Sequence, residues 1–148
     1  ANLPREQIHQ AASALVLSTL ARSGIRWKPP LPENLERLRR HIQANLLGDL
    51  RNPTLAKTAG ISVPTLSRLF TNFLGRSPAQ YVTEIRVREA ARLLLESDLN
   101  IDKVGEQTGF PNRFYFSRVF KAVSGETPAR FRSKYHSADP APDPAAAR

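Results

Sequence analysis

The sequence contains no cysteine, and this absence removes several classes of function. Disulfides, thiolate metal sites and cysteine nucleophiles are all excluded, and the composition is compatible with a reducing cytoplasm. No apolar run approaches the roughly 18 residues of a membrane span, and no signal peptide is evident. We therefore expect a cytoplasmic protein that has no membrane partner.

Groups typical of enzymes are also scarce. Histidine occurs only at His9, His41 and His136, and there is no His-Glu-x-x-His, no glycine-rich phosphate loop and no Gly-x-Ser-x-Gly. We predict no catalytic residue, no metal site and no cofactor, and therefore no enzyme.

Acidic residues are few in comparison with basic ones. The chain has 13 Asp and Glu against 22 Lys and Arg, a formal net charge of +9. Residues 51–134 hold 14 Lys and Arg against 7 Asp and Glu, so most of the excess lies there. A basic surface of this kind suits a polyanion, although on its own it can also serve solubility.

The most informative feature that is present is a repeat. Ser67-Arg68-Leu69-Phe70 matches Ser117-Arg118-Val119-Phe120, and Gly75-Arg76-Ser77-Pro78-Ala79-Gln80-Tyr81 matches Gly125-Glu126-Thr127-Pro128-Ala129-Arg130-Phe131. A repeat determines the architecture before any single motif does. The chain is therefore expected to contain two copies of one helical unit.

Each copy has the pattern of a helix-turn-helix. A short helix, Pro53–Ala59 in the first copy and Ile101–Thr108 in the second, ends at a glycine, which tolerates the positive φ of a helix C-terminus. Ser62 or Asn112 can then cap a second helix, which runs to the next glycine.

The second helix of each copy has two distinct faces at 100° per residue. The apolar face, which should be buried, comprises Leu66, Leu69, Phe70 and Phe73, matched by Phe116, Val119, Phe120 and Val123. The opposite face comprises Pro64, Ser67, Arg68 and Thr71, matched by Phe114, Ser117, Arg118 and Lys121. Small polar and cationic groups suit the major groove, where Arg can bind guanine O6 and N7 in a bidentate way.

Arg68 and Arg118 share one repeat position and are the strongest candidates for base contacts; the alternative is a surface arginine paired with a carboxylate. The other base-contact candidates are Pro64, Ser67, Arg113, Phe114 and Ser117. Phe114 could meet a thymine methyl group or could pack against Tyr115 or the preceding turn. Phosphate contacts, which hold register without reading sequence, are predicted for Thr65, Thr71, Asn72 and Lys121.

A long helix should join the two copies. Ser77-Pro78-Ala79-Gln80 predicts a capping box that opens it, and its apolar residues cover more than one face, so it can pack against a unit on each side. From Pro78 to Glu96 it would be roughly 28 Å long, which compares with about 34 Å between successive major-groove faces. We therefore predict an all-α fold, with two helix-turn-helix subdomains at about 53–74 and 101–124 joined by a long central linker helix at about 78–97.

The rest of the chain is less specific. Residues 1–25 are predicted to hold an amphipathic helix at 4–22, and residues 33–135 to form the repeated module. Between them, residues 26–32 form a proline-rich linker. We interpret Trp27 in this linker as a packing anchor rather than a base-stacking residue. A helix from about Glu33 to Leu46 begins this module. Its arginines would usually form a solvated face, and the minority interpretation is that they contact phosphates. The tail, 136–148, should be disordered.

This series of motifs resembles the AraC/XylS family of bacterial transcription regulators, from about Leu35 to Tyr135. The likeness rests on Leu66-Ser67-Arg68-Leu69-Phe70, Gly75-x-Ser77-Pro78-x-x-Tyr81, Arg86-x-x-x-Ala90-x-x-Leu93-Leu94, Gly109-Phe110-x-x-x-x-x-Phe116-Ser117-Arg118-Val119-Phe120-Lys121 and Gly125-x-Thr127-Pro128-x-x-Phe131-Arg132. The resemblance implies a C-terminal DNA-binding domain and a transcription factor, in particular an activator, whose partners are double-stranded DNA and RNA polymerase at the bacterial nucleoid. It also implies the same base-contacting residues.

Four further points accompany this resemblance. Family members commonly carry an N-terminal sensing and dimerisation domain, so the helix at 4–22 could be its last element or could pack on the module itself. A first residue other than Met fits either a fragment of a longer regulator or removal of the initiator Met. Gly105 stands where the family usually has alanine, which should loosen its helix. A helical RNA-binding or protein-interaction adaptor is the alternative function.

Overall fold

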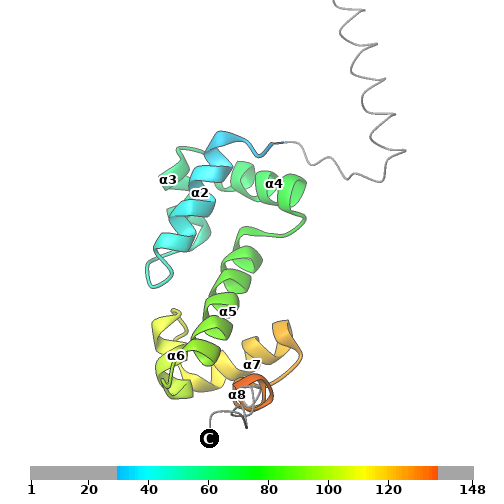
Figure 1. The fold of residues 1–148 in the computed structure, drawn as a ribbon. Coiled ribbons are helices and arrows are strands. Elements are labelled where there is room, and N and C mark those ends of the chain that lie inside the picture. Colours follow the sequence, from blue (N-terminus) through cyan, green and yellow to red (C-terminus); the bar gives the residue numbers. More distant parts are fainter. Residues whose placement is uncertain (1–29, 137–148) are drawn as a thin grey trace, which may run out of the picture. The chain divides into compact units, whose positions relative to one another are not determined.

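The computed structural model describes residues 30–136, which contain helices and no strand (Figure 1). The helices are α2 (Glu33–Ala44), α3 (Asn52–Ala59), α4 (Val63–Leu74), α5 (Pro78–Glu96), α6 (Ile101–Gln107), α7 (Arg113–Ser124) and α8 (Pro128–His136). The predicted all-α fold, with two helix-turn-helix subdomains joined by a long helix, is confirmed. The predictions for residues 4–22, Trp27 and the tail beyond His136 lie outside the described residues.

The first subdomain packs α2, α3 and α4 around one apolar core. α3 contacts both α2 and α4, and α4 in turn contacts α5. The core side chains recur every three or four residues, the spacing that places them on one face of a helix, and they are Leu35, Leu38, Ile42, Leu55, Leu66 and Phe70. The ring of Phe70 meets Tyr81 of α5 edge to face, with ring centroids 5.5 Å apart.

The second subdomain packs α6, α7 and α8 around the C-terminal half of α5. Its buried cluster consists of Val87, Ala90, Leu94, Val104, Phe110, Phe116 and Phe120. Aromatic rings follow one another through it, because Phe116 contacts both Phe110 and Phe120, and Phe120 contacts Phe131 of α8. The prediction that Phe70 and Phe120 are core residues is therefore confirmed, since neither ring is exposed.

The linker helix α5 has the capping box that its sequence predicts. The Ser77 hydroxyl accepts from the Gln80 N–H at 3.2 Å, and the Gln80 side chain accepts from the Ser77 N–H at 2.9 Å. At the other end, the Arg132 guanidinium of α8 donates to the Leu94 carbonyl at 3.1 Å. Helix α5 is thus tied at its start by a local cap and at its end by the second subdomain.

Two expectations about helix ends and faces are wrong. Helix α2 ends at Ala44 rather than near Leu46, because Asn45 leaves the helical conformation and its side chain donates to the His41 carbonyl at 2.8 Å. Val123, expected in the buried stripe, is 47 % exposed. Every residue from Lys121 to Gly125 is exposed, so the last turn of α7 projects beyond the core.

Gly105 allows a close helix contact within the second subdomain. A Cβ at this position would lie 3.0 Å from Cδ1 and 3.2 Å from Cβ of Phe116, which is buried in α7. The missing side chain therefore brings α6 and α7 nearer to each other than an alanine would permit without an adjustment.

Candidate nucleic-acid interface

Helix α4 presents one apolar and one polar face. Its first turn is capped by Ser62, whose hydroxyl accepts from the Thr65 N–H at 3.3 Å and also hydrogen-bonds the Thr65 hydroxyl at 2.9 Å. Leu66 and Phe70 are fully buried. Of the predicted DNA contacts on this helix, Ser67 and Thr65 are half-buried, and the exposed ones are Pro64, Arg68, Thr71 and Asn72.

Helix α7 repeats this arrangement in the second subdomain. The Asn112 side chain accepts from the Tyr115 N–H at 2.8 Å, and Phe116 is buried on the inner face. On the outer face Ser117 is half-buried, and the exposed predicted contacts are Arg113, Phe114, Arg118 and Lys121. No predicted contact residue on either helix is buried, so all of them remain candidates.

The candidate arginines have different neighbours. Within residues 30–136, Arg68 forms no ion pair. The Arg118 guanidinium carbon lies 5.4 Å from the centre of the Tyr115 ring, within the range of a cation–π contact. Arg113 Nε lies 3.4 Å from Asp102 Oδ1 of α6, where both side chains are more than half exposed. Solvent screening keeps such a pair weak, and DNA can replace it.

Phe114 is the most exposed large apolar side chain of the described chain, at 86 %. Its neighbour Tyr115 turns the other way, toward Phe110, with ring centroids 6.2 Å apart. A solvated phenyl ring in the first turn of a recognition helix is available for an apolar contact with a base, such as a thymine methyl group.

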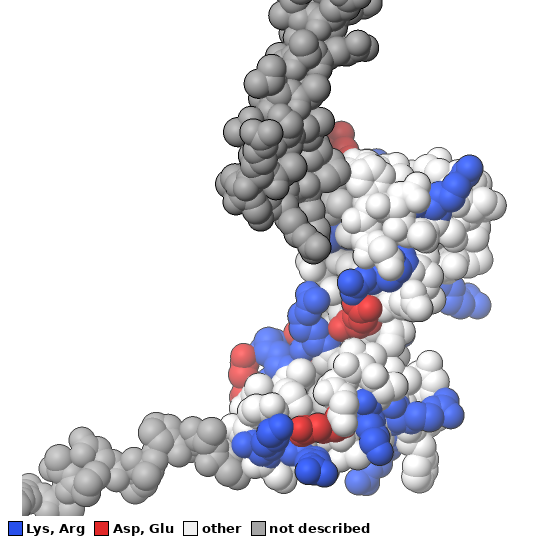
Figure 2. Space-filling model, turned by 90° about the vertical axis from the view of Figure 1, so that its right-hand side faces the viewer, with Lys and Arg blue, Asp and Glu red and all other residues white. Residues whose placement is uncertain are grey.

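The charge around these helices favours an anion. Neither α4 nor α7 contains an acidic residue, whereas the three carboxylates of α5 are all paired with arginines, Glu89 and Glu96 with Arg92 of the same helix and Glu84 with Arg76. The Glu89 carboxylate accepts from Arg92, which lowers the pKa of Glu89. Figure 2 shows Lys and Arg side chains spread over both the upper and the lower part of the described chain.

Other kinds of site lack support in the described part of the chain. In residues 30–136 no three His, Asp or Glu side chains gather in a way that could hold a metal ion. None of the helices there combines the length and the apolar character that a membrane crossing requires.

Two residues to which the sequence analysis gave no role in binding belong to this surface or support it. Tyr115 lies under Arg118, and its position three residues earlier on the same helix is a signal that could have identified it. Arg86 of α5 reaches the loop after α2, where its Nε and Nη2 donate to the Leu46 carbonyl at 3.1 and 2.8 Å. Two signals in the sequence could have identified Arg86, since it begins one of the motifs shared with the family and it is a cation between two apolar residues, Ile85 and Val87.

Comparison with known proteins agrees with this geometry. Residues 55–134 match a family model described as a helix-turn-helix domain. An HTH-type transcriptional regulator of Bacillus subtilis, YfiF, is 39 % identical over 101 residues, which are 68 % of this chain and 32 % of that protein. The chain spans between 31 % and 36 % of the length of the first curated relatives that it matches.

Solved structures share the fold as well. The C-terminal domain of AraT, a response regulator from Geobacillus stearothermophilus, superposes with a TM-score of 0.71 at 31 % identity, covering 76 % of this chain and 94 % of that one. The DNA-binding domain of AdpA, solved with a target DNA, gives 0.70 at 29 % identity, covering 74 % and 98 %. From these matches and from its two helix-turn-helix units, the chain belongs to the AraC/XylS family of transcription regulators.

Proposed function

We propose that residues 33–135 form a DNA-binding domain that reads two adjacent major-groove segments of one duplex, with α4 in the first and α7 in the second. The proposed base contacts are Pro64, Ser67, Arg68, Arg113, Phe114, Ser117 and Arg118, and the proposed phosphate contacts are Thr65, Thr71, Asn72 and Lys121. The domain is a binding module of a transcription regulator rather than an enzyme.

One observation carries this proposal. Two helices at matching places of a repeat each bury one phenylalanine completely, Phe70 in one and Phe120 in the other, and each leaves an arginine exposed at the matching position of the outer face. An arginine on the exposed face of a helix that fits the major groove is the commonest means of reading guanine. Its occurrence in both copies is what a bipartite site requires.

The relatives suggest the wider setting. One is named a transcriptional activator and another was solved on a target DNA. By analogy we propose that this chain acts on chromosomal DNA at the nucleoid and that it contacts RNA polymerase. A sensing domain N-terminal to residue 33 would suit the relatives' greater length.

The direct test is selection of bound duplexes from a library with a randomised segment of about 21 base pairs, which covers two helical turns. We expect a bipartite motif whose halves are one turn apart. Competition of the selected duplex against single-stranded RNA of the same sequence should leave the duplex bound. Recovery of no motif, or equal competition by the RNA, would overturn the proposal in favour of a helical RNA-binding or protein-interaction adaptor.

A further inference from the structure

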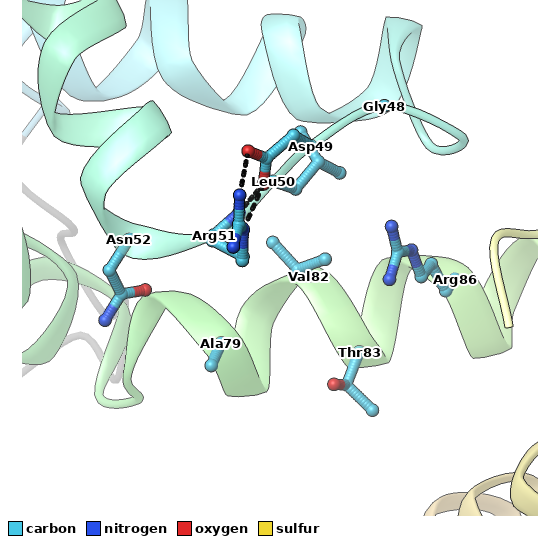
Figure 3. Close-up of a pocket in the computed structure, with 9 residues that line it drawn as sticks. All are labelled: Gly48, Asp49, Leu50, Arg51, Asn52, Ala79, Val82, Thr83 and Arg86. Atoms are coloured by element: carbon cyan, nitrogen blue, oxygen red, sulfur yellow. Dashed lines mark hydrogen bonds and ion pairs between the residues drawn. The ribbon is translucent and has the colours of Figure 1, made fainter. Parts of the chain in front are cut away.

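Three segments that are distant in sequence meet at one point between the two helix-turn-helix subdomains. Arg86 comes from the linker helix α5, Leu46 from the loop between α2 and α3, and Gly109 from the turn between α6 and α7. Figure 3 shows the Arg86 side chain rising from α5 toward the loop that contains Gly48 and Asp49, beside a groove of about 420 Å³. We call Arg86, Leu46 and Gly109 the joint.

The Arg86 guanidinium is held by a carbonyl rather than by a carboxylate. Its Nε and Nη2 both donate to the Leu46 oxygen, and within residues 30–136 it forms no ion pair. Burial lowers the pKa of Arg86, which remains charged because arginine titrates far above neutrality. A partly desolvated cation is costly unless its hydrogen bonds are made, so the α2–α3 loop must stay where its carbonyl can accept them.

The turn of the second subdomain closes the joint from the other side. Gly109 has φ of +84°, and a Cβ there would lie 2.5 Å from the Leu46 oxygen and 2.9 Å from Arg86 Nε. The backbone of the second helix-turn-helix therefore rests against the Arg86 guanidinium and against the Leu46 carbonyl of the first subdomain. No larger residue fits without separating them.

The joint is also close to the recognition helix α7. Phe110 follows Gly109, is buried, and contacts the rings of both Tyr115 and Phe116. Tyr115 in turn lies under the Arg118 guanidinium. A shift of the α6–α7 turn would thus move Phe110 and Tyr115, and with them Arg118, the side chain proposed to read a base.

We propose that Arg86 is a positioning residue that fixes the distance and rotation between the two reading helices, and so determines which half-site spacing the protein accepts. This inference rests on the proposed function. A bivalent ligand gains affinity only when its geometry matches the spacing of its sites. Loss of the joint should therefore weaken discrimination between spacings more than it weakens binding of either half-site.

The test uses the duplex selected with the wild-type chain and versions with one base pair inserted or deleted between its halves. We expect the wild type to lose about tenfold or more in affinity when the spacing changes, whereas Arg86→Ala should lose no more than about threefold. Arg86→Lys, which keeps the charge but has a single donor nitrogen in place of the two that bind Leu46, should be intermediate. If Arg86→Ala keeps the wild-type spacing ratio, the inference is wrong, whereas absence of a bipartite motif for the wild type would refute the proposed function instead.

Gly109 offers a second variant with a matched control. Gly109→Ala and Gly60→Ala each place a side chain at positive φ, +84° and +67°, but nothing lies within 4 Å of a Cβ at Gly60. Backbone strain is thus common to both, and only the first inserts a methyl group into the joint. We expect relaxed spacing from Gly109→Ala and wild-type spacing from Gly60→Ala. Equal behaviour of the two variants would contradict a role for the joint.

A readout without DNA separates positioning from reading. The chain has no cysteine, so spin labels can be attached through Arg37→Cys on α2 and Ser133→Cys on α8, both exposed. Pulsed electron spin resonance should give a narrow distribution of label distances, and the added Arg86→Ala change should broaden it while circular dichroism shows unchanged helix content. An unbroadened distribution would mean that the subdomains are held together without Arg86.

Discussion

Arg68 and Arg118 occupy the same place in the two copies but do not have the same surroundings. Arg118 lies over the Tyr115 ring, which limits the directions that its guanidinium can take. Arg68 forms neither an ion pair nor a cation–π contact with any of residues 30–136. A side chain that is already ordered loses less entropy on binding, so Arg118 should be the better reader of the two.

Replacing either arginine by alanine tests this difference. We expect Arg68→Ala and Arg118→Ala each to weaken binding to the selected duplex by about 1–3 kcal/mol, with the larger loss at Arg118, and to relax preference at one base pair. Arg92→Ala is the control, because this exposed arginine of α5 is already paired with Glu89 and Glu96. Fluorescence anisotropy on the selected and a random duplex measures both effects. An equal loss on the two duplexes would reassign that arginine to a phosphate contact.

Lys121 tests the phosphate class of contact. It is exposed in the last turn of α7 and forms no ion pair within the described chain. Lys121→Ala should weaken binding to the selected and random duplexes alike and should reduce the slope of log affinity against log salt by about one. The slope is obtained from titrations at several salt concentrations, with Arg92→Ala again as the reference. An unchanged slope would remove Lys121 from the interface.

At the scale of elements, the contact between α6 and α7 determines how a substitution at Gly105 changes stability. Alanine would raise helix propensity by about 1 kcal/mol, but its Cβ would meet the Phe116 ring at 3.0 Å. Phe116 is fully buried and has little room to move, and overpacking costs about 1–3 kcal/mol. We therefore expect Gly105→Ala to lower the free energy of unfolding, measured by urea denaturation, contrary to the expectation that glycine loosens this helix.

Two further variants test this explanation, one at Ala56, the equivalent residue of the first copy, and one at Phe116, the residue that Gly105 contacts. Ala56→Gly in α3 should also destabilise, by about 1 kcal/mol, because there a buried methyl group and helix propensity are lost. In a double-mutant cycle, Gly105→Ala should cost less in a Phe116→Leu background than in the wild type, because a smaller leucine can move away from the new methyl group more easily than the buried ring. A more stable Gly105→Ala single variant would show that propensity outweighs the packing strain.

The elements that the sequence predicted well depend on contacts between near neighbours. The Ser77 and Gln80 capping box and the Asn112 cap join residues three apart, and the buried and exposed faces of α4 and α7 follow from a 3.6-residue period. The end of α2 was missed although it depends on a local contact, that of Asn45 with His41, whereas the other error and the main omission concern positions set by distant parts of the chain. Val123 matches the period but lies beyond the core, and Arg86 binds a carbonyl forty residues away. Exposure could thus be predicted for the candidate site, whereas the joint behind it could not.

At the scale of the whole molecule, one chain carries both reading helices, and α5 packs against each subdomain. The contacts of one helix therefore raise the effective concentration of the other at its own half-site. Bivalency of this kind has a consequence for paired variants, because two sites that act independently on one bound state add in free energy.

The double variant Arg68→Ala with Arg118→Ala decides whether both helices engage at once. Simultaneous engagement predicts a loss equal to the sum of the two single losses, about 2–6 kcal/mol in total. If the chain used only one helix on the duplex, one single variant would be silent and the double variant would match the other. Anisotropy on the selected duplex, and on duplexes with either half scrambled, distinguishes these outcomes. Scrambling the first half should make Arg68→Ala silent while Arg118→Ala keeps its full effect, because only the α7 half-site then remains to be read.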